Sequence, residues 1–217
     1  MNLEAPNEGR IQTRFVRAEH RAGKVPLWTK FAQGFSALPG QHKEWAFNTL
    51  LLLYYSQVLG LPASAASIVI AISLVFDAIS DPMAGAISDS YRSKFGRRHA
   101  LMLMSIIPSC GAMYALFAPP DHLSTTALAA WLLVSTVTLR VSFSFFAVPW
   151  AAMSAELSQQ SEERTSIQTY RVAVGWFVGV VFVFTMYSQF FPPTESDPSG
   201  LLNPDSFSPF GLLVSIL

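Results

Sequence analysis

Charged residues are scarce in this sequence: they make up 13% of its 217 residues, whereas 51% are hydrophobic. A soluble domain carries about 25% charged residues, so this deficit excludes an ordinary soluble protein. Lysine and arginine together number 14, as do aspartate and glutamate, and the net charge of zero offers no basis for binding nucleic acid. The composition therefore predicts a protein whose surroundings are lipid.

Cysteine and the residue groups that build active sites are also lacking. Cys110 is the single cysteine, so no disulfide can form within the chain. The sequence contains no Ser/His/Asp set, no phosphate-binding loop, no Cys-x-x-Cys and no histidines at metal-ligand spacing. The first 26 residues are polar and basic and lack the short apolar stretch and cleavage site of a signal peptide. We therefore expect no enzyme, no catalytic residue, no cofactor and no removable leader.

The sequence does contain a series of long apolar runs. A membrane-spanning helix needs about 20 mostly apolar residues. Five runs reach that length, at residues 31–59, 63–87, 100–118, 126–157 and 168–191. A sixth run begins near Phe207 and stops with the chain at Leu217. The pattern predicts an all-α membrane protein with a tail over residues 1–30 and a helical bundle over residues 31–217, and we expect a fragment that ends within its sixth helix.

Lysine and arginine are strongly segregated along the chain. All but Lys43 and Arg140 lie in the N-terminal tail, between the second and third runs, or between the fourth run and the start of the fifth. The other connections contain aspartate and glutamate but neither lysine nor arginine. Because basic connections stay on the cytoplasmic side of a membrane, this segregation predicts an integral protein of the plasma membrane or bacterial inner membrane whose N-terminus is cytoplasmic.

Two aspartates interrupt the second apolar run. Asp77 and Asp81 lie one helical turn apart, and Ser80 shares their face of the helix. An ionised carboxylate at the bilayer centre costs about 2.5–3.5 kcal/mol, and a bound cation or proton offsets that cost. Na⁺ prefers oxygen ligands, and two close carboxylates retain a proton when no metal is bound, so the pair predicts a site for Na⁺ or H⁺. The alternative is a polar contact between helices without a transport role.

The residues that follow this pair extend it into a longer motif. Gly85-Ala-Ile-Ser-Asp89 precedes a basic loop that ends in Gly96-Arg-Arg98. This order resembles the signature between the second and third helices of the major facilitator superfamily. The preceding Asp77-Ala-Ile-Ser-Asp-Pro82 is similar to the glycoside–pentoside–hexuronide:cation symporters, the family of melibiose permease. Further segments agree with that family: residues 53–61, Val148-Pro-Trp150, Glu163-Arg-Thr165 and Tyr170-Arg171. Vertebrate lysophospholipid symporters share these motifs.

The resemblance implies the N-terminal six-helix bundle of a major facilitator fold, which works with a C-terminal half that this chain lacks. It implies a cation site made of the two aspartates and two hydroxyl residues: Asp77, Ser80, Asp81 and Ser144. It also implies a cytoplasmic gate made of the motif that follows: Gly85, Asp89, Arg92, Gly96, Arg97 and Arg98. From the residues themselves we expect Gly85 to admit a neighbouring helix closely and Asp89 to pair with Arg92 or Arg97. A basic loop that only sets the topology is the alternative.

The expected substrate cavity departs from the melibiose-type pattern. Gln41 and Ala147 stand where that pattern has aspartates that accept bonds from sugar hydroxyls, so a melibiose-like substrate is disfavoured. The polar and aromatic candidates for the cavity are Gln41, Glu44, Asn48, Arg140, Trp150 and Arg171. A buried Arg140 needs a partner, for which Asp77 and Glu44 are the candidates. That pair is either a permanent structural contact or a part of the coupling.

These inferences converge on a membrane symporter that moves a sugar, glycoside or related small solute together with Na⁺ or H⁺. A lysolipid or another amphiphile is an alternative cargo for the same fold. An inactive truncated membrane protein is a second alternative, and a membrane enzyme that uses Asp77 and Asp81 as acid and base is a third. The sequence does not choose between the two coupling ions, because both use the same carboxylates.

Overall fold

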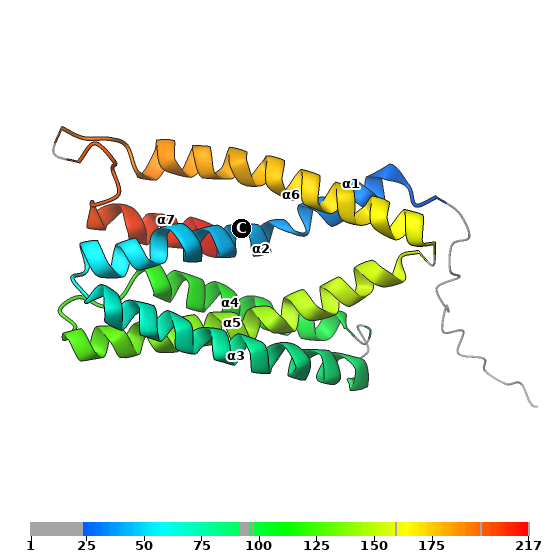
Figure 1. Ribbon diagram of the computed structural model, residues 1–217, viewed down its shortest axis with the longest axis horizontal. Coiled ribbons are helices and arrows are strands. Elements are labelled where there is room, and N and C mark those ends of the chain that lie inside the picture. The colour runs from blue at the N-terminus through cyan, green and yellow to red at the C-terminus, as the bar shows by residue number, and fades with distance from the viewer. Residues whose placement is uncertain (1–23, 92–95, 97, 159, 196, 217) are drawn as a thin grey trace, which may run out of the picture.

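The computed structural model describes residues 24–91, 96, 98–158, 160–195 and 197–216, and their regular elements are all helical (Figure 1). The α-helices are α1 (Leu27–Phe35), α2 (Leu38–Trp45), α3 (Ala63–Ser90), α4 (His99–Phe117), α5 (Thr125–Glu156), α6 (Ser161–Phe190) and α7 (Phe207–Ile216). The shorter elements are two π-helical segments, η1 (Ala46–Leu51) and η2 (Tyr54–Val58), and a 3₁₀ helix, η3 (Pro204–Ser206). The predicted all-α fold is confirmed.

The first apolar run does not form one straight helix. A turn at Ser36 and Ala37 separates α1 from α2. Pro39 is the second residue of α2 and has no N–H to bond to the carbonyl of Phe35, so regular helical hydrogen bonding is interrupted at this point. The single span expected over residues 31–59 is therefore two α-helices followed by π-helical segments, and such segments are frequent at functional sites.

The long helices run back and forth along one axis, so their connections alternate between two ends of the bundle (Figure 1). The α5–α6 connection lies at the end where the described chain begins, whereas the α4–α5 and α6–η3 connections lie at the opposite end (Figure 1). The first end carries Lys24, Arg98 and Arg164, and the second carries Asp121 and Asp197. The segregation of charge along the sequence thus becomes a separation between the two ends of one bundle.

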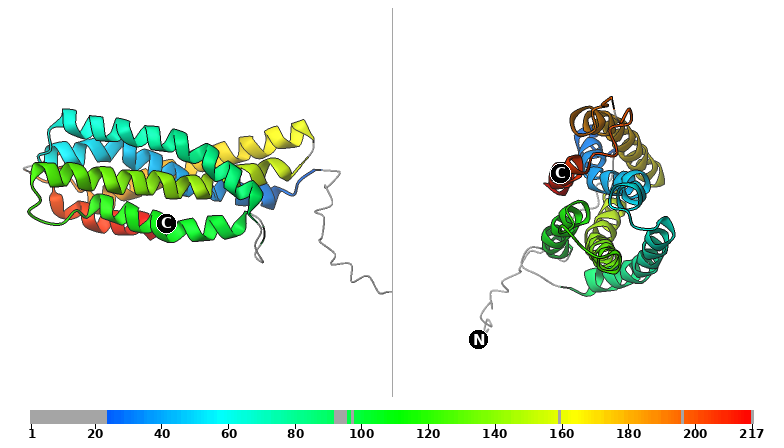
Figure 2. Two further views of the ribbon diagram at one scale, coloured as in Figure 1. Left: turned by 90° about the horizontal axis from the view of Figure 1, so that it is seen from below. Right: turned by 90° about the vertical axis from the view of Figure 1, so that its left-hand side faces the viewer.

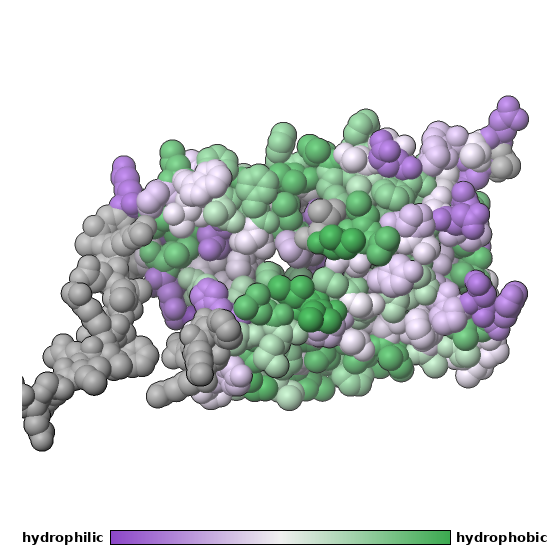
Figure 3. Space-filling model, turned by 180° about the vertical axis from the view of Figure 1, so that it is seen from behind, coloured by the Kyte–Doolittle hydropathy of each residue, from purple (hydrophilic) through white to green (hydrophobic). Residues whose placement is uncertain are grey.

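The surface of the bundle is suited to lipid. Helices α3, α4, α5 and α6 are each long and apolar enough to cross a bilayer, and only 17% of the most apolar segment of α6 is buried inside the protein. Ile107, Phe177 and Phe184 are 80%, 73% and 75% exposed. Apolar residues cover much of the middle of the face in Figure 3, and hydrophilic residues gather toward its ends. Such an apolar surface marks a membrane contact, and the chain is an integral membrane protein.

Helix α5 lies against both α3 and α4, while α1 packs on α6 and α7 packs on α4 (Figure 2). A cluster of buried aromatic residues supports α7 where it meets η2, α4 and the end of α6: Tyr54, Phe117, Phe191, Phe207 and Phe210. A Cβ at Gly211 would lie 2.6 Å from the Cβ of Phe117, so glycine is what allows α7 to approach α4 this closely. Helices α3 and α5 pack side by side, and polar residues of both helices meet between them.

Candidate cation and substrate sites

An ion pair joins α3 to α5 within their apolar segments. The Nη1 atom of Arg140 lies 2.7 Å from Oδ2 of Asp77, and the Nε–H of Arg140 donates to Oγ of Ser73 at 3.0 Å. The guanidinium carbon also lies 4.8 Å from the centroid of the Phe47 ring on η1. Because Arg140 is only 6% exposed, these neighbours hold it in a buried position. Of the two partners expected from the sequence, Asp77 is the one that Arg140 contacts.

Two hydroxyl groups connect the same helices about one turn further along. The Oγ atoms of Ser80 and Ser144 are 2.9 Å apart, and the two residues are 5% and 2% exposed. Each hydroxyl also lies within hydrogen-bonding distance of a carbonyl one turn earlier, Ser144 of that of Arg140 at 3.1 Å and Ser80 of that of Asp77 at 3.2 Å. Because each hydroxyl has one hydrogen, one serine donates to the other and the second donates to its carbonyl. The structure thus brings together Asp77, Ser80 and Ser144, three of the four residues expected at the cation site.

Asp81 differs from Asp77 although the two lie one turn apart. Asp81 is exposed and makes no hydrogen bond or ion pair with the described part of the chain, whereas Asp77 is half-buried and compensated by Arg140. Two carboxylates and one guanidinium together carry one net negative charge, which a single monovalent cation neutralises. Two aspartates that look equivalent in the sequence are therefore unequal in the structure.

The residues expected to form a cytoplasmic gate lie at the end of α3 and the start of α4. Nη2 of Arg98 is 3.1 Å from Oδ1 of Asp89, and Nη1 is 2.7 Å from Oε1 of Glu156 on α5. Burial lowers the pKa of Arg98, but its hydrogen bonds to the two carboxylates outweigh burial, so the pKa is raised overall. The expected partners of Asp89, which are Arg92 and Arg97, lie outside the described residues. Glu156 is a member of this cluster that no sequence motif signalled.

The two glycines of the gate motif have different surroundings. A Cβ at Gly85 would lie 3.7 Å from Cγ1 of Val148, which is an ordinary contact distance, so an alanine fits there. Gly85 thus faces Val148 of α5 at ordinary contact distance, and among the described residues this approach does not require glycine. Gly96 has a φ of 97°, a conformation that glycine adopts far more readily than other residues, so the chain needs Gly96 in order to turn before α4.

A separate cavity of about 240 Å³ lies beside the break between α1 and α2. Three of the expected substrate residues line it, namely Gln41, Trp150 and Arg171. The guanidinium carbon of Arg171 lies 4.1 Å from the ring centroid of Trp150, whose Nε1–H donates to Oγ of Ser36 at 2.8 Å. Within the described residues Arg171 has no carboxylate partner. The cavity therefore combines an aromatic face with a positive charge that no acidic group balances.

The other expected substrate residues do not join this cavity. Arg140 is bound to Asp77, and Glu44 and Asn48 are exposed. Glu44 pairs instead with Lys43, with 3.1 Å between Nζ and Oε1. The residues expected to line one cavity are thus divided among several surroundings.

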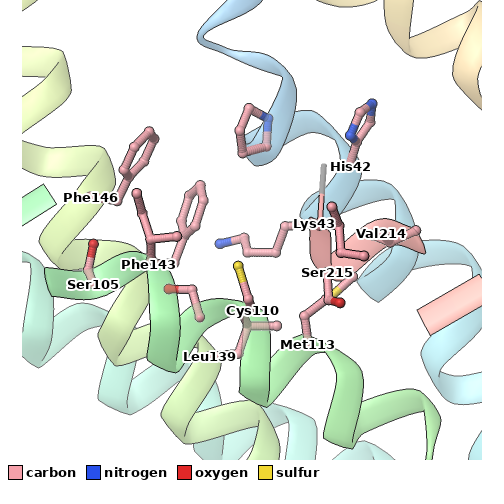
Figure 4. A pocket seen from close by; sticks show the side chains of 14 residues that line it. His42, Lys43, Ser105, Cys110, Met113, Leu139, Phe143, Phe146, Val214 and Ser215 are labelled. Atoms are coloured by element: carbon pink, nitrogen blue, oxygen red, sulfur yellow. The ribbon is translucent and has the colours of Figure 1, made fainter. Parts of the chain in front are cut away.

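A second cavity, of about 210 Å³, lies among α2, α4, α5 and α7 (Figure 4). Lys43 reaches into it toward Phe143 and Cys110 (Figure 4), and its Nζ lies 4.4 Å from the centroid of the Phe143 ring. The neighbouring His42 is 6% exposed, stacks on Phe182 at 3.7 Å between ring centroids, and has no hydrogen bond from either ring nitrogen to the described residues. The sequence places both residues in the first apolar run, but a single lysine or histidine in such a run has no spacing from which a site can be recognised.

The Glu163-Arg-Thr165 motif anchors α1 to the start of α6. Oε2 of Glu163 lies 2.9 Å from Nζ of Lys30 and accepts the backbone N–H of Val25 at 3.1 Å. Nζ of Lys30 also donates to Oγ of Ser166 at 2.7 Å. This buried pair gives the motif a structural role at the basic end of the bundle.

Charges retained inside membrane-spanning helices and a polar cavity beside a discontinuous first helix are features found in membrane transporters. The match to known families narrows that class. The chain belongs to the family described as MFS/sugar transport protein, whose model matches residues 32–217. The resemblance to the major facilitator superfamily drawn from the motifs is confirmed.

Curated relatives of this chain carry symporter names. An uncharacterized symporter of Synechocystis sp. is 28% identical over 203 residues, which are 90% of this chain and 36% of the relative. An uncharacterized symporter of Bacillus subtilis is 33% identical over 152 residues, 68% of this chain and 32% of the relative. The sodium-dependent lysophosphatidylcholine symporter 1 of Gallus gallus is 26% identical over 152 residues, 70% of this chain and 28% of the relative. The chain spans about a third of the length of these relatives.

Proposed function

We propose that the chain provides the N-terminal part of a symporter that couples the movement of a solute to Na⁺ or H⁺. The observation that carries this proposal is the site between α3 and α5, where Asp77 is compensated by Arg140 and Asp81 is left without a partner among the described residues. Charges inside membrane segments are costly and usually functional. The symporter names of the relatives support the same conclusion.

Coupling in this proposal is thermodynamic linkage between two sites. A cation held by Asp77, Ser80, Asp81 and Ser144 neutralises the site between α3 and α5, and the neutral site favours solute in the cavity of Trp150 and Arg171. The solute then favours the cation by the same factor. In the complete transporter of this proposal a second helical half contributes to both sites, and the two halves rock so that the sites open to each side in turn.

We assign the basic end of the bundle to the cytoplasm and the membrane to the plasma or bacterial inner membrane. The support is the collection of lysine and arginine at that end, which is the side on which basic connections remain during insertion. In this orientation the contacts of Arg98 with Asp89 and Glu156 form part of the cytoplasmic gate, together with Gly85, Gly96, Arg92 and Arg97.

For the cargo we propose a sugar, glycoside or related solute, in line with the family description. Gln41 offers an amide for hydrogen bonds, and the Trp150 ring offers a face on which a sugar ring can stack. A lysolipid is the second candidate. It is favoured by the unbalanced positive charge of Arg171, which suits the phosphate of a lipid headgroup, and by a relative named for lysophosphatidylcholine.

Transport by the complete protein that carries this chain, reconstituted in vesicles, tests the proposal. We expect uptake driven by a Na⁺ or a proton gradient, with the two gradients imposed separately, and loss of that uptake in Asp77→Asn. Asp121→Asn is the matched control, because Asp121 lies in the α4–α5 connection, and it should keep uptake. Unchanged gradient-driven uptake in Asp77→Asn contradicts the cation site. Counterflow of glycosides, uronides and lysolipids in the same vesicles identifies the cargo.

A further inference from the structure

Arg140 occupies the side of Asp77 that a coupling cation needs. Its Nη1 atom is 2.7 Å from Oδ2 of Asp77, a charge-assisted hydrogen bond of the strong kind. A metal ion bound to the same oxygen lies within a few ångströms of the guanidinium, and two positive charges at that distance repel each other, most strongly where water is excluded. Arg140 and the cation therefore compete for Asp77.

The surroundings of Arg140 prevent it from simply leaving the site. Its Nε–H donates to Oγ of Ser73 at 3.0 Å, and the Ser73 hydroxyl in turn donates to the carbonyl of Ile70 at 2.7 Å. The ring of Phe47 covers the guanidinium at 4.8 Å, and the residue is 6% exposed. Removal of a buried arginine from all its partners is costly, so its charge stays at the site whether or not a cation is bound.

The charge that remains at the site limits what it can bind. Asp77 and Asp81 contribute two negative charges and Arg140 one positive charge, and no other charged side chain contacts these three within the described residues. One monovalent cation brings the site to neutrality. A divalent cation, or a second monovalent one, leaves an excess positive charge in an apolar segment, which is costly.

We propose that Arg140 is an internal counter-cation, which competes with the coupling cation for Asp77 and limits the site to one monovalent ion. The inference rests on the proposed function, because a role in selecting cations requires that a cation binds there. Arg140 is thus a specificity-determining residue whose effect depends on its charge. The sequence left the pair of Arg140 and Asp77 as either a permanent structural contact or a part of the coupling, and we assign it to the coupling.

Cation binding to the complete protein that carries this chain, purified in detergent, tests this role without requiring transport. Thermal unfolding is followed by tryptophan fluorescence while NaCl replaces choline chloride at constant ionic strength, and MgCl₂ is tested separately. Arg140→Gln makes the site more negative by one charge. We expect it to lower the half-saturating Na⁺ concentration at least tenfold, equivalent to about 1.4 kcal/mol, and to create a response to Mg²⁺. Arg140→Lys keeps the charge and should stay within threefold of the unchanged protein.

Two further variants keep the test decisive if Arg140→Gln does not fold. Asp77→Asn leaves one carboxylate and one guanidinium, so the Na⁺ response should disappear. Asp77→Asn combined with Arg140→Gln restores one net negative charge, so the Na⁺ response should return. Its half-saturating Na⁺ concentration should lie at least tenfold below the lowest value compatible with the data for Asp77→Asn alone. The combined variant removes both members of the pair and leaves neither charge uncompensated, which favours folding.

The outcomes separate this inference from the function on which it rests. Equal half-saturating Na⁺ concentrations with and without Arg140 overturn the role of Arg140 alone, and so does a combined variant that binds no better than Asp77→Asn. A lack of response to Na⁺ in every variant overturns the role of Arg140 together with the placement of the cation site. A protein without a Na⁺ response that acquires one through Arg140→Gln supports the inference and indicates that the natural coupling ion is H⁺.

Discussion

Gly34, in the last turn of α1, should be unable to accept a single methyl group without displacement of a helix. A Cβ at Gly34 would lie 2.6 Å from Cβ and 2.9 Å from Cγ1 of Val174 on α6, whereas carbon atoms in good contact are about 3.5–4.0 Å apart. The Cβ of Val174 cannot rotate away, because it is attached directly to the backbone. Helix α1 must therefore move by about 1 Å, and overpacking of this kind costs about 1–3 kcal/mol.

Gly179→Ala on α6 is the matched control. A Cβ at Gly179 meets no atom within 4 Å, so this variant adds a methyl group without a clash. Alanine favours a helix over glycine by about 0.5–1 kcal/mol, and this gain applies to both variants. We therefore expect Gly34→Ala to have a free energy of unfolding about 1–3 kcal/mol lower than that of Gly179→Ala.

Unfolding of the purified protein by titration of SDS into a mild detergent, followed by tryptophan fluorescence, measures this difference. Gly34 lies two residues before Ser36, whose hydroxyl accepts a hydrogen bond from Trp150 at the proposed substrate cavity, so Gly34→Ala should also weaken solute binding while Gly179→Ala leaves it unchanged. Equal free energies of unfolding for the two variants would refute the tight contact between α1 and α6.

Three further predictions follow from the described contacts. Arg98→Gln removes two ion pairs in which Arg98 is 10% exposed but the carboxylates are 64% and 58% exposed. Because water screens the carboxylates, the free energy of unfolding in detergent should fall by less than about 1 kcal/mol; a larger loss shows that burial of Arg98 outweighs that screening. Trp150→Leu should weaken solute binding more than Trp150→Phe, because only phenylalanine keeps an aromatic face beneath Arg171; equal dissociation constants by calorimetry argue against stacking. A hydrogen bond from the Ser199 hydroxyl lowers the pKa of Asp197 from its ordinary 3.8. The ionised carboxylate therefore stabilises its loop above pH 3.8, and this stabilisation is lost as the pH falls through the lowered pKa. The Leu202 amide donates to Asp197 at 2.7 Å, so its hydrogen-exchange protection should fall only below pH 3.8.

Most helix positions follow from local composition. The second apolar run was expected over residues 63–87, and α3 covers Ala63–Ser90; the other long runs agree to within a few residues except at the start of α6. The first run is the exception. A proline such as Pro39 is tolerated as a kink in many membrane helices, so the sequence does not reveal that the chain turns at Ser36 before α2 begins.

The residues of the proposed cation site are easier to group from the sequence than those of the proposed substrate cavity. Asp77, Ser80 and Asp81 are close in the sequence, and their spacing alone places them along one helix face. The substrate candidates come from three different helices, and whether they meet depends on how those helices are rotated. Gln41, Trp150 and Arg171 do meet, whereas the remaining candidates lie elsewhere.

The sequence by itself determined that the protein lies in a membrane, that it is helical, that basic residues mark one side, and to which superfamily it is similar. Each of these depends on composition or on the spacing of nearby residues. Only the tertiary structure decided that Arg140 pairs with Asp77 rather than Glu44, because the pair joins residues 63 positions apart. The packing of α3 against α5 brings these charges together, and a buried charge takes the partner that packing places within reach.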